Sequence, residues 1–244
     1  MNRALVAGAA GMAAQQAIID AISVNLSNAD TPGYRSDRPE FAALIAPGSG
    51  SIGAVDIGQR KLFSQGKLES TNNDDDLAIE GEGLFEVRSS AGRAAFTRAG
   101  NFTPDAEGHL RLPCGASLAG VSLPRGTTQI TVAADGTLRC RVAGKTSDVI
   151  AGHIRLCAFA DNTRLRCDAD GLFYPTQASG KCFRGEPGTG GFGTIEQRCL
   201  ERANVDVVGA MMAVLAAQRA YEASAKTVQA ADELLRLANN LERG

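Results

Sequence analysis

The chain has 244 residues, 44% of them hydrophobic, with 25 Lys and Arg against 27 Asp and Glu. That length and composition support a folded protein with a sizeable core, and a net charge of −2 argues against a dedicated nucleic-acid-binding protein. No apolar run reaches 18 residues, so the sequence predicts no segment that spans a membrane.

The N-terminal segment predicts an amphipathic helix rather than a secretory leader. Large apolar residues recur every seven positions, at Leu5, Met12, Ile19 and Leu26. Ile22 follows three positions after Ile19. Arg3 and the apolar stretch after it resemble the start of a signal peptide, but Gln15 and Gln16 interrupt that stretch, so we expect no cleaved leader. The turn residues Pro32 and Gly33 end the helical pattern.

Residues 34–66 predict a connector, and residues 67–203 predict a β-rich domain. The connector contains one short helical turn followed by a Gly- and Ser-rich stretch. After it, short runs rich in β-branched and aromatic residues alternate with Glu-Gly, Asp-Gly and Gly-Asn pairs, which is typical of short antiparallel strands joined by turns. The middle of the chain is therefore expected to be all-β.

The C-terminal segment predicts one long helix over about residues 205–241, with Asn204 or Asp206 as its N-cap. A large apolar row with seven-residue spacing lies beside a small row, which lets another helix approach closely. The large row is Val207, Val214, Tyr221, Val228 and Leu235, with Met211 beside it. The small row is Ala210, Ala217, Ser224, Ala231 and Ala238. The N-terminal helix is the expected partner.

The predicted fold class is α+β. Residues 1–33 and 204–244 form a coiled-coil-like helical module that flanks the all-β middle. Such a module suits polymerisation, because contacts between copies that do not close on themselves generate a helical filament.

The sequence indicates no catalytic, cofactor or metal site. Gly188-Thr-Gly-Gly-Phe-Gly193 matches a dinucleotide fingerprint in spacing alone, since it lies in a β-rich region without a βαβ unit. Asp74, Asp75 and Asp76 fit turn chemistry better than a metal cluster, because neighbouring side chains on an extended segment point in alternating directions. His109 and His153 have the pattern of surface residues. We therefore expect a protein that is not an enzyme.

The six cysteines leave two interpretations open. They are Cys114, Cys140, Cys157, Cys167, Cys182 and Cys199. They lack zinc spacing, so they are either buried apolar thiols or two or three disulfides formed in an oxidising compartment. Bridges between Cys157 and Cys167 or between Cys182 and Cys199 would each close a short loop.

Three separated segments resemble the bacterial flagellar basal-body rod proteins of the rod and hook class. At the N-terminus the resemblance rests on Asn25, Leu26, Ser27, Asn28, Thr31, Pro32, Gly33, Tyr34 and Arg35. In the middle it rests on the stretch from Leu77 to Leu110, including Thr97, Arg98, Ala99 and Gly100. At the C-terminus it rests on Leu200, Glu201, Asn204, Val205, Gln218, Arg219, Tyr221 and Glu222, with Ala203 in place of the usual Ser. The three segments occur in the family's order along nearly the whole chain.

The resemblance implies a structural subunit of the proximal or distal rod, without enzyme activity or cofactor. It implies export through the flagellar type III apparatus, a place in the periplasmic rod, and assembly with itself and with other rod and hook subunits, without nucleic acid and without insertion into the lipid bilayer. The terminal helices would form the assembly interface, and Asn28, Thr31, Pro32, Gly33 and Tyr34 would form a signature turn. The alternatives are a hook-like or other flagellar axial tube component, or a periplasmic enzyme or binding module that uses the β domain.

Overall fold

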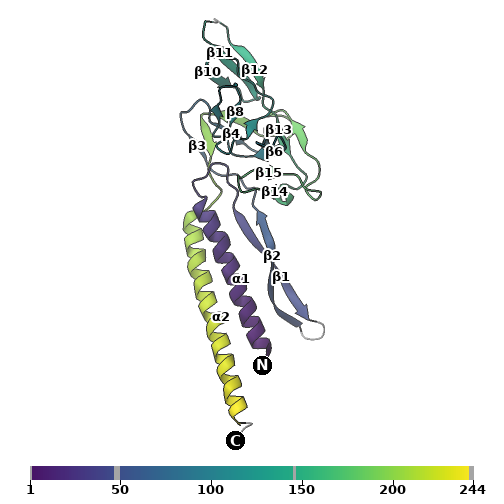
Figure 1. The fold of residues 1–244 in the computed structure, drawn as a ribbon, viewed down its shortest axis with the longest axis vertical. Helices are drawn as coiled ribbons and strands as arrows, with labels where there is room; N and C mark the ends of the chain where they lie inside the picture. The colour runs from purple at the N-terminus through teal and green to yellow at the C-terminus, as the bar shows by residue number, and fades with distance from the viewer. Residues whose placement is uncertain (1, 47–49, 145–146, 242–244) are drawn as a thin grey trace. The chain divides into compact units, whose positions relative to one another are not determined.

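The computed structural model describes residues 2–46, 50–144 and 147–241, and it has the expected α+β class (Figure 1). The chain divides into two compact units. One contains the chain up to Asn28, Ser36–Leu62, and the chain from Val205 onward. The other contains Ala29–Arg35 and Phe63–Asn204. Both units are therefore built from segments that lie far apart in the sequence.

The first unit consists of two long helices and a β-hairpin. The helices are α1 (Asn2–Ser27) and α2 (Val207–Leu241), and the antiparallel strands of the hairpin are β1 (Asp37–Ala46) and β2 (Gly50–Lys61). The two helices pack against each other and run antiparallel, and the hairpin packs against α1 (Figure 1). Asp206 caps α2, because its carboxylate accepts the backbone N–H of Gly209 at 3.1 Å.

The hairpin corrects the expectation of a connector with a short helical turn. Its strands pair from Asp37 with Lys61 to Ala46 with Gly50, and the register shifts twice, after Glu40 and after Leu44. These shifts break the period-two alternation that marks a strand in a sequence. The hairpin also packs against α1, and this support cannot be read from the local sequence.

Helix α1 corrects the expectation about apolar length. Over Leu5–Ser27 it is long and apolar enough to cross a membrane by length and composition. The longest uninterrupted apolar run does not measure this property, because Gln15, Gln16 and Asp20 interrupt the segment without making it polar overall. Mostly buried core helices of soluble proteins and N-terminal signal sequences meet the same criterion.

The second unit is the β-rich middle of the chain. Its strands are β3 (Leu68–Ser70), β4 (Leu77–Glu80), β5 (Leu84–Arg88), β6 (Ala94–Thr97), β7 (Thr103–Pro104), β8 (Leu110–Arg111), β9 (Ser117–Leu118), β10 (Thr127–Val132), β11 (Thr137–Val142), β12 (Val149–His153), β13 (Leu156–Ala158), β14 (Arg166–Cys167), β15 (Phe173–Tyr174), β16 (Phe183–Gly185), β17 (Thr194–Gln197) and β18 (Cys199–Glu201). A short 3₁₀-helix covers Asn162–Arg164.

The strands of this unit form one large sheet, one small sheet and two isolated pairs. The large sheet has the order β14-β15-β6-β5-β9-β8-β7, and β13 joins it between β5 and β16. The small sheet has the order β10-β11-β12, and the pairs are β17 with β4 and β18 with β3. The main core packs Phe85 edge-on against Phe102 at a ring distance of 5.7 Å. A second cluster does the same with Phe96 and Phe159 at 4.9 Å.

Candidate functional site

The two long helices approach closely where small residues face each other. A Cβ added to Gly8 would lie 2.5 Å from Val228 Cγ2, and one added to Gly11 would lie 3.2 Å from Ser224 Oγ. Ala217, another member of the small row on α2, is 4% exposed. Ser224 and Ala217 of the small row therefore lie on the side of α2 that packs against α1.

The residues expected to form an assembly interface divide into two groups. Most are half-buried within the helical unit: Leu5, Met12, Ile19, Ile22, Leu26, Val214 and Val228. Val207, Met211 and Tyr221 are exposed, at 38%, 54% and 39%. The side chain of Leu235 lies outside the described residues. The half-buried group is available mainly to the helix pair itself, and the exposed group is available to another molecule.

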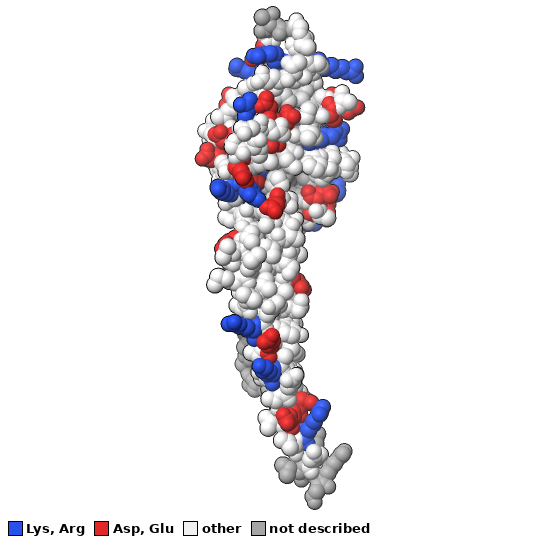
Figure 2. Space-filling view, turned by 90° about the vertical axis from the view of Figure 1, so that its left-hand side faces the viewer, with Lys and Arg blue, Asp and Glu red and all other residues white. Residues whose placement is uncertain are grey.

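An exposed apolar stripe lies on α2, on the side away from Ala217. Val208, Met211, Met212 and Leu215 have the spacing of one helical face, and each is at least 54% exposed. Residues 207–218 contain no charged side chain, and Figure 2 shows a mostly uncharged surface along the first part of α2, with Lys, Arg, Asp and Glu further along. Seven-residue spacing does not pick out Val208, Met212 and Leu215. A 3.6-residue period finds them.

A buried ion-pair cluster lies in the β-rich unit and joins segments from both ends of the chain. Glu201 in β18 accepts Arg35 Nη2 at 2.7 Å, Arg98 Nη1 at 3.1 Å and the Gly66 backbone N–H at 2.7 Å. The side chains of Arg35 and Glu201 are fully buried, and that of Arg98 is 5% exposed. Burial lowers the pKa of Arg98, the nearby Glu201 carboxylate raises it, and Arg35 lowers it again.

The signature turn packs against this cluster through its glycine. Gly33 has φ +69°, and its N–H donates to the Glu201 carbonyl at 2.7 Å. A Cβ at this position would lie 2.3 Å from the backbone nitrogen of Ala99, so both the backbone conformation and the close contact require glycine. Asn204 donates its N–H to the Tyr34 carbonyl at 3.4 Å. Two sequence-predicted segments, one from each end of the chain, therefore meet here.

The remaining turn and middle residues extend the same contact. Arg202 and Asp30 form an ion pair. Arg98 Nη1 also donates to the Ile79 carbonyl at 3.1 Å. Gly100 lies so close to the Leu77 backbone that a Cβ would overlap its carbonyl oxygen. These contacts explain why an arginine at position 98 and a glycine at position 100 suit the fold.

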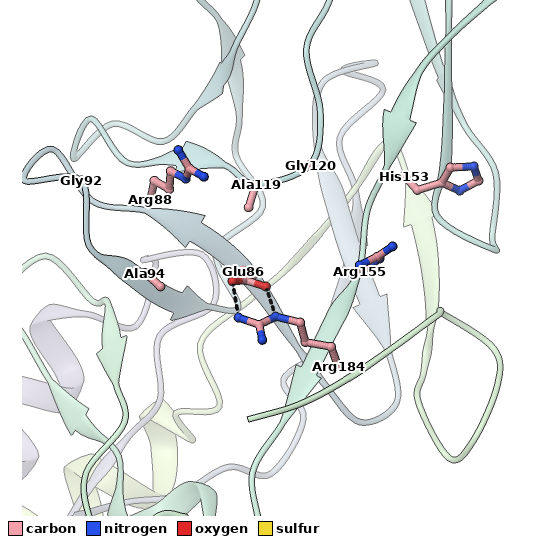
Figure 3. A pocket seen from close by; sticks show the side chains of 9 residues that line it. All are labelled: Glu86, Arg88, Gly92, Ala94, Ala119, Gly120, His153, Arg155 and Arg184. Carbon is pink, nitrogen blue, oxygen red and sulfur yellow. Dashed lines mark hydrogen bonds and ion pairs between the residues drawn. The ribbon is translucent and has the colours of Figure 1, made fainter. Parts of the chain in front are cut away.

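A basic hollow of about 740 Å³ lies elsewhere on the β-rich unit. Figure 3 shows Arg88, Arg155 and the Glu86–Arg184 pair around it. Arg184 binds Glu86 through two hydrogen bonds of 2.7 and 2.8 Å, and this pairing holds the pKa of the Glu86 carboxyl below its ordinary range. No local sequence pattern indicates this hollow, because its residues come mainly from β5, β16 and the segment around β12 and β13.

The other sequence motifs have structural surroundings. The Gly188–Gly193 segment leads into strand β17 rather than a helix, and the Gly188 N–H donates to the Gly193 carbonyl at 2.9 Å. Asp76 accepts the side chains of Thr71 and Asn73. Within the described ranges, no group of three His, Cys, Asp or Glu residues could hold a metal ion.

None of the six cysteines forms a disulfide, so neither proposed bridge is present in this structure. Cys140 and Cys157 are buried, and the other four are half-buried. Cys182 packs against the cluster that contains Cys157, rather than pairing with Cys199. The structure therefore favours the interpretation of packed apolar thiols.

Three family models match the chain in sequence order. "Flagella basal body rod protein" matches residues 5–35, "Flagellar hook protein FlgE/F/G D1 domain" matches residues 78–140, and "Flagellar basal body rod FlgEFG protein C-terminal" matches residues 196–241. The first and third contain the two ends that meet at Glu201, and the second contains Arg98.

Two rod proteins match along nearly the full length of the chain, and a hook protein matches about half of it. The chain is 33% identical to the flagellar basal-body rod protein FlgG of Caulobacter vibrioides, over 98% of this chain and 99% of that protein. It is 33% identical to FlgG of Borreliella burgdorferi over the whole of both chains. It is also 37% identical to the flagellar hook protein FlgE of Rhizobium meliloti, over 56% of this chain and 35% of that one.

Proposed function

Because the chain belongs to the family of flagellar basal-body rod proteins and is a structural subunit of that rod, we propose that it polymerises through its two terminal helices into a tube that transmits torque. The helical module of this proposal is built from residues 1–33 and 204–244, and the signature turn at the end of the first range belongs to the β-rich unit. The β-rich domain, residues 67–203, is carried by that module.

The exposed stripe on α2 is the single observation that carries this proposal. Val208, Met211, Met212 and Leu215 are 54–70% exposed, although burying a large apolar side chain stabilises by roughly 1.5–3 kcal/mol. A neighbouring subunit that covers the stripe gains this free energy. The stripe lies on a different side of α2 from Ala217, so helix pairing and subunit contact can occur together. A contact between different faces of two copies builds a helical filament when the rotation between the copies does not close a ring.

The proposal includes the location and partners of the subunit. The relatives place the family in the flagellar basal body, and the rod and hook matches support assembly with other flagellar axial proteins. We further propose that the chain reaches a periplasmic rod through the flagellar type III export apparatus without a cleaved signal peptide. In this view it binds neither nucleic acid nor the bilayer interior, and it performs no catalysis and needs no cofactor. The apolar α1 helix then serves in packing against α2 and neighbouring subunits.

A hook-like axial component is the second candidate function. The match to the Rhizobium meliloti hook protein supports it over about half of the chain. The rod relatives match over nearly all of it, and this favours the rod. Electron microscopy of basal bodies from a deletion strain distinguishes them: loss of the rod supports the first function, whereas an intact rod that lacks a hook supports the second.

Substitutions in the stripe test how the subunits assemble. Met211→Asp and Leu215→Asp place a charge on the exposed stripe, so we expect them to abolish rod assembly in the deletion strain while the helix content of the purified protein stays unchanged. Ala216→Asp is the matched control, because Ala216 is exposed on the same helix but lies outside the stripe. Rods of normal length with Met211→Asp, or equal failure with Ala216→Asp, would overturn the stripe as the assembly surface.

Two half-buried positions extend the test to the helix pair. Val214→Asp and Ile19→Asp should also abolish assembly, but with a loss of helix content, because both residues are half-buried in the helical unit. The β-rich unit should remain folded in both variants. A rod of normal length built from Ile19→Asp subunits would contradict a role for α1 in assembly.

A further inference from the structure

The basic hollow has more positive charge than its own carboxylate neutralises. Glu86 is already bound by both hydrogen bonds from Arg184. Arg88 and Arg155 line the same hollow, and within the described part of the chain neither guanidinium makes an ion pair. Both are exposed (Figure 3). Arg155 acts on Glu86 only through its charge, which lowers the pKa of that carboxyl. Two guanidinium groups therefore line the hollow without an ion-pair partner among the described residues, an arrangement that suits a second carboxylate.

An acidic site on the same unit has a negative charge that no neighbouring cation pairs with among the described residues. Asp75 lines a cleft of about 200 Å³ together with Thr128 and Gln129 of β10. Its neighbours Asp74 and Asp76 already have partners, since Asp74 pairs with Arg198 and Asp76 accepts hydrogen bonds from Thr71 and Asn73. Among the described residues, no cation pairs with Asp75. Burial and the charges of the two neighbouring carboxylates raise its pKa.

The two sites adjoin opposite edge strands of one small sheet. Its strand order is β10-β11-β12. The acidic cleft is lined by β10, whereas His153 at the end of β12 and Arg155 just beyond it line the basic hollow. The two cavities share no lining residue. One copy of the chain thus presents a negative site at one edge of the sheet and a positive site at the other.

We propose that the hollow formed by Arg88, Arg155 and the Glu86–Arg184 pair receives the Asp75 edge of a second copy of this chain. This inference rests on the proposed function, because it describes a contact between neighbouring subunits. Opposite charges on different faces favour a head-to-tail contact, which extends a helical filament when the rotation between copies does not close a ring. It adds to the apolar helix contact a polar one in the β-rich unit, and charge complementarity of this kind fixes register more than affinity.

Charge reversal and its repair test the contact. Sedimentation velocity of the purified full chain measures self-association, and electron microscopy of basal bodies measures rod assembly. We expect Arg155→Glu and Asp75→Arg each to weaken self-association about tenfold, because each replaces an ion pair by like charges. The double variant Arg155→Glu/Asp75→Arg should restore it. In the unaltered chain, raising NaCl to about 0.5 M should weaken the contact, since salt screens exposed charges.

The controls separate this inference from the proposed function. Arg139→Glu reverses a charge on the middle strand β11, outside both sites, and should leave self-association unchanged. Met211→Asp removes the helix contact and should abolish assembly whatever the charges do. Normal association of Arg155→Glu, or a double variant no better than the single ones, overturns the inference while leaving the helix proposal intact. If Met211→Asp assembles normally, the proposed function fails instead.

Discussion

Replacing Glu201 by Gln should destabilise the β-rich unit more than any surface change. The carboxylate is fully buried and accepts hydrogen bonds from Arg35, Arg98 and the Gly66 N–H. Gln has nearly the same shape, so the change removes the negative charge and leaves two buried guanidinium groups without a counter-charge. Removing one partner of a buried ion pair costs about 3–5 kcal/mol, against a typical domain stability of about 5–15 kcal/mol.

The assay is differential scanning calorimetry of the purified chain. For a protein of this size, each kcal/mol shifts Tm by about 2–4 °C, so Glu201→Gln should lower Tm by about 6–20 °C. Glu69→Gln is the matched control. Glu69 pairs with Arg202 at 3.2 Å, but its side chain is 53% exposed, and such pairs contribute under about 1 kcal/mol.

Arg35→Met probes the other side of the pair. Within the described residues, Arg35 Nε and Nη1 have no hydrogen-bond partner, so the buried guanidinium is incompletely compensated. Met fills much of its volume, and Glu201 keeps Arg98 and Gly66 as partners. Arg35→Met should therefore cost less than Glu201→Gln. Equal Tm values for Glu201→Gln and Glu69→Gln would refute the reasoning.

Two further predictions concern stability at low pH and the packing of α1 against α2. Hydrogen bonding from Arg111 lowers the pKa of Asp105 to about 2, so its stabilising effect is complete above the unfolded pKa of about 3.9 and is lost as pH falls toward 2. Arg111→Gln should raise that pKa in an NMR titration of the carboxyl carbon, and an unchanged midpoint would contradict this. Gly8→Ala should destabilise the helix pair by about 1–3 kcal/mol in urea unfolding followed by circular dichroism, since the new Cβ meets Val228 Cγ2 at 2.5 Å. Adding Val228→Ala should relieve the overlap, and a stabilised single variant would show that the helices can move apart.

Periodicity in the sequence predicted the two helices closely. The expected C-terminal helix over about residues 205–241 is observed as Val207–Leu241, and the turn at Pro32 and Gly33 follows the end of α1 at Ser27. Helix signals are local, because apolar spacing and capping act within a few turns. Of the two candidate N-caps, Asp206 is the one whose carboxylate reaches Gly209.

The hairpin at Asp37–Lys61 was missed for the opposite reason. Its strands contain two register shifts, and it packs against α1. The signature turn was expected in the helical module, but Ala29–Arg35 belongs to the β-rich unit. The helix before this segment and the hairpin after it belong to the helical unit. Contacts with Glu201, which is far away in sequence, hold the turn in the β-rich unit.

The sequence by itself determined the α+β class, the long terminal helices, the strand-rich middle and, through three separated signatures, the family. Those properties follow from local spacing and turn chemistry. Only the tertiary structure decided that Arg35 and Arg98 share Glu201, and that basic and acidic sites lie at opposite edges of one small sheet. Arg35 and Glu201 are 166 positions apart, and charged residues in a sequence have no local mark of burial. Folding brings them together, and the loss of water around them makes their charges matter.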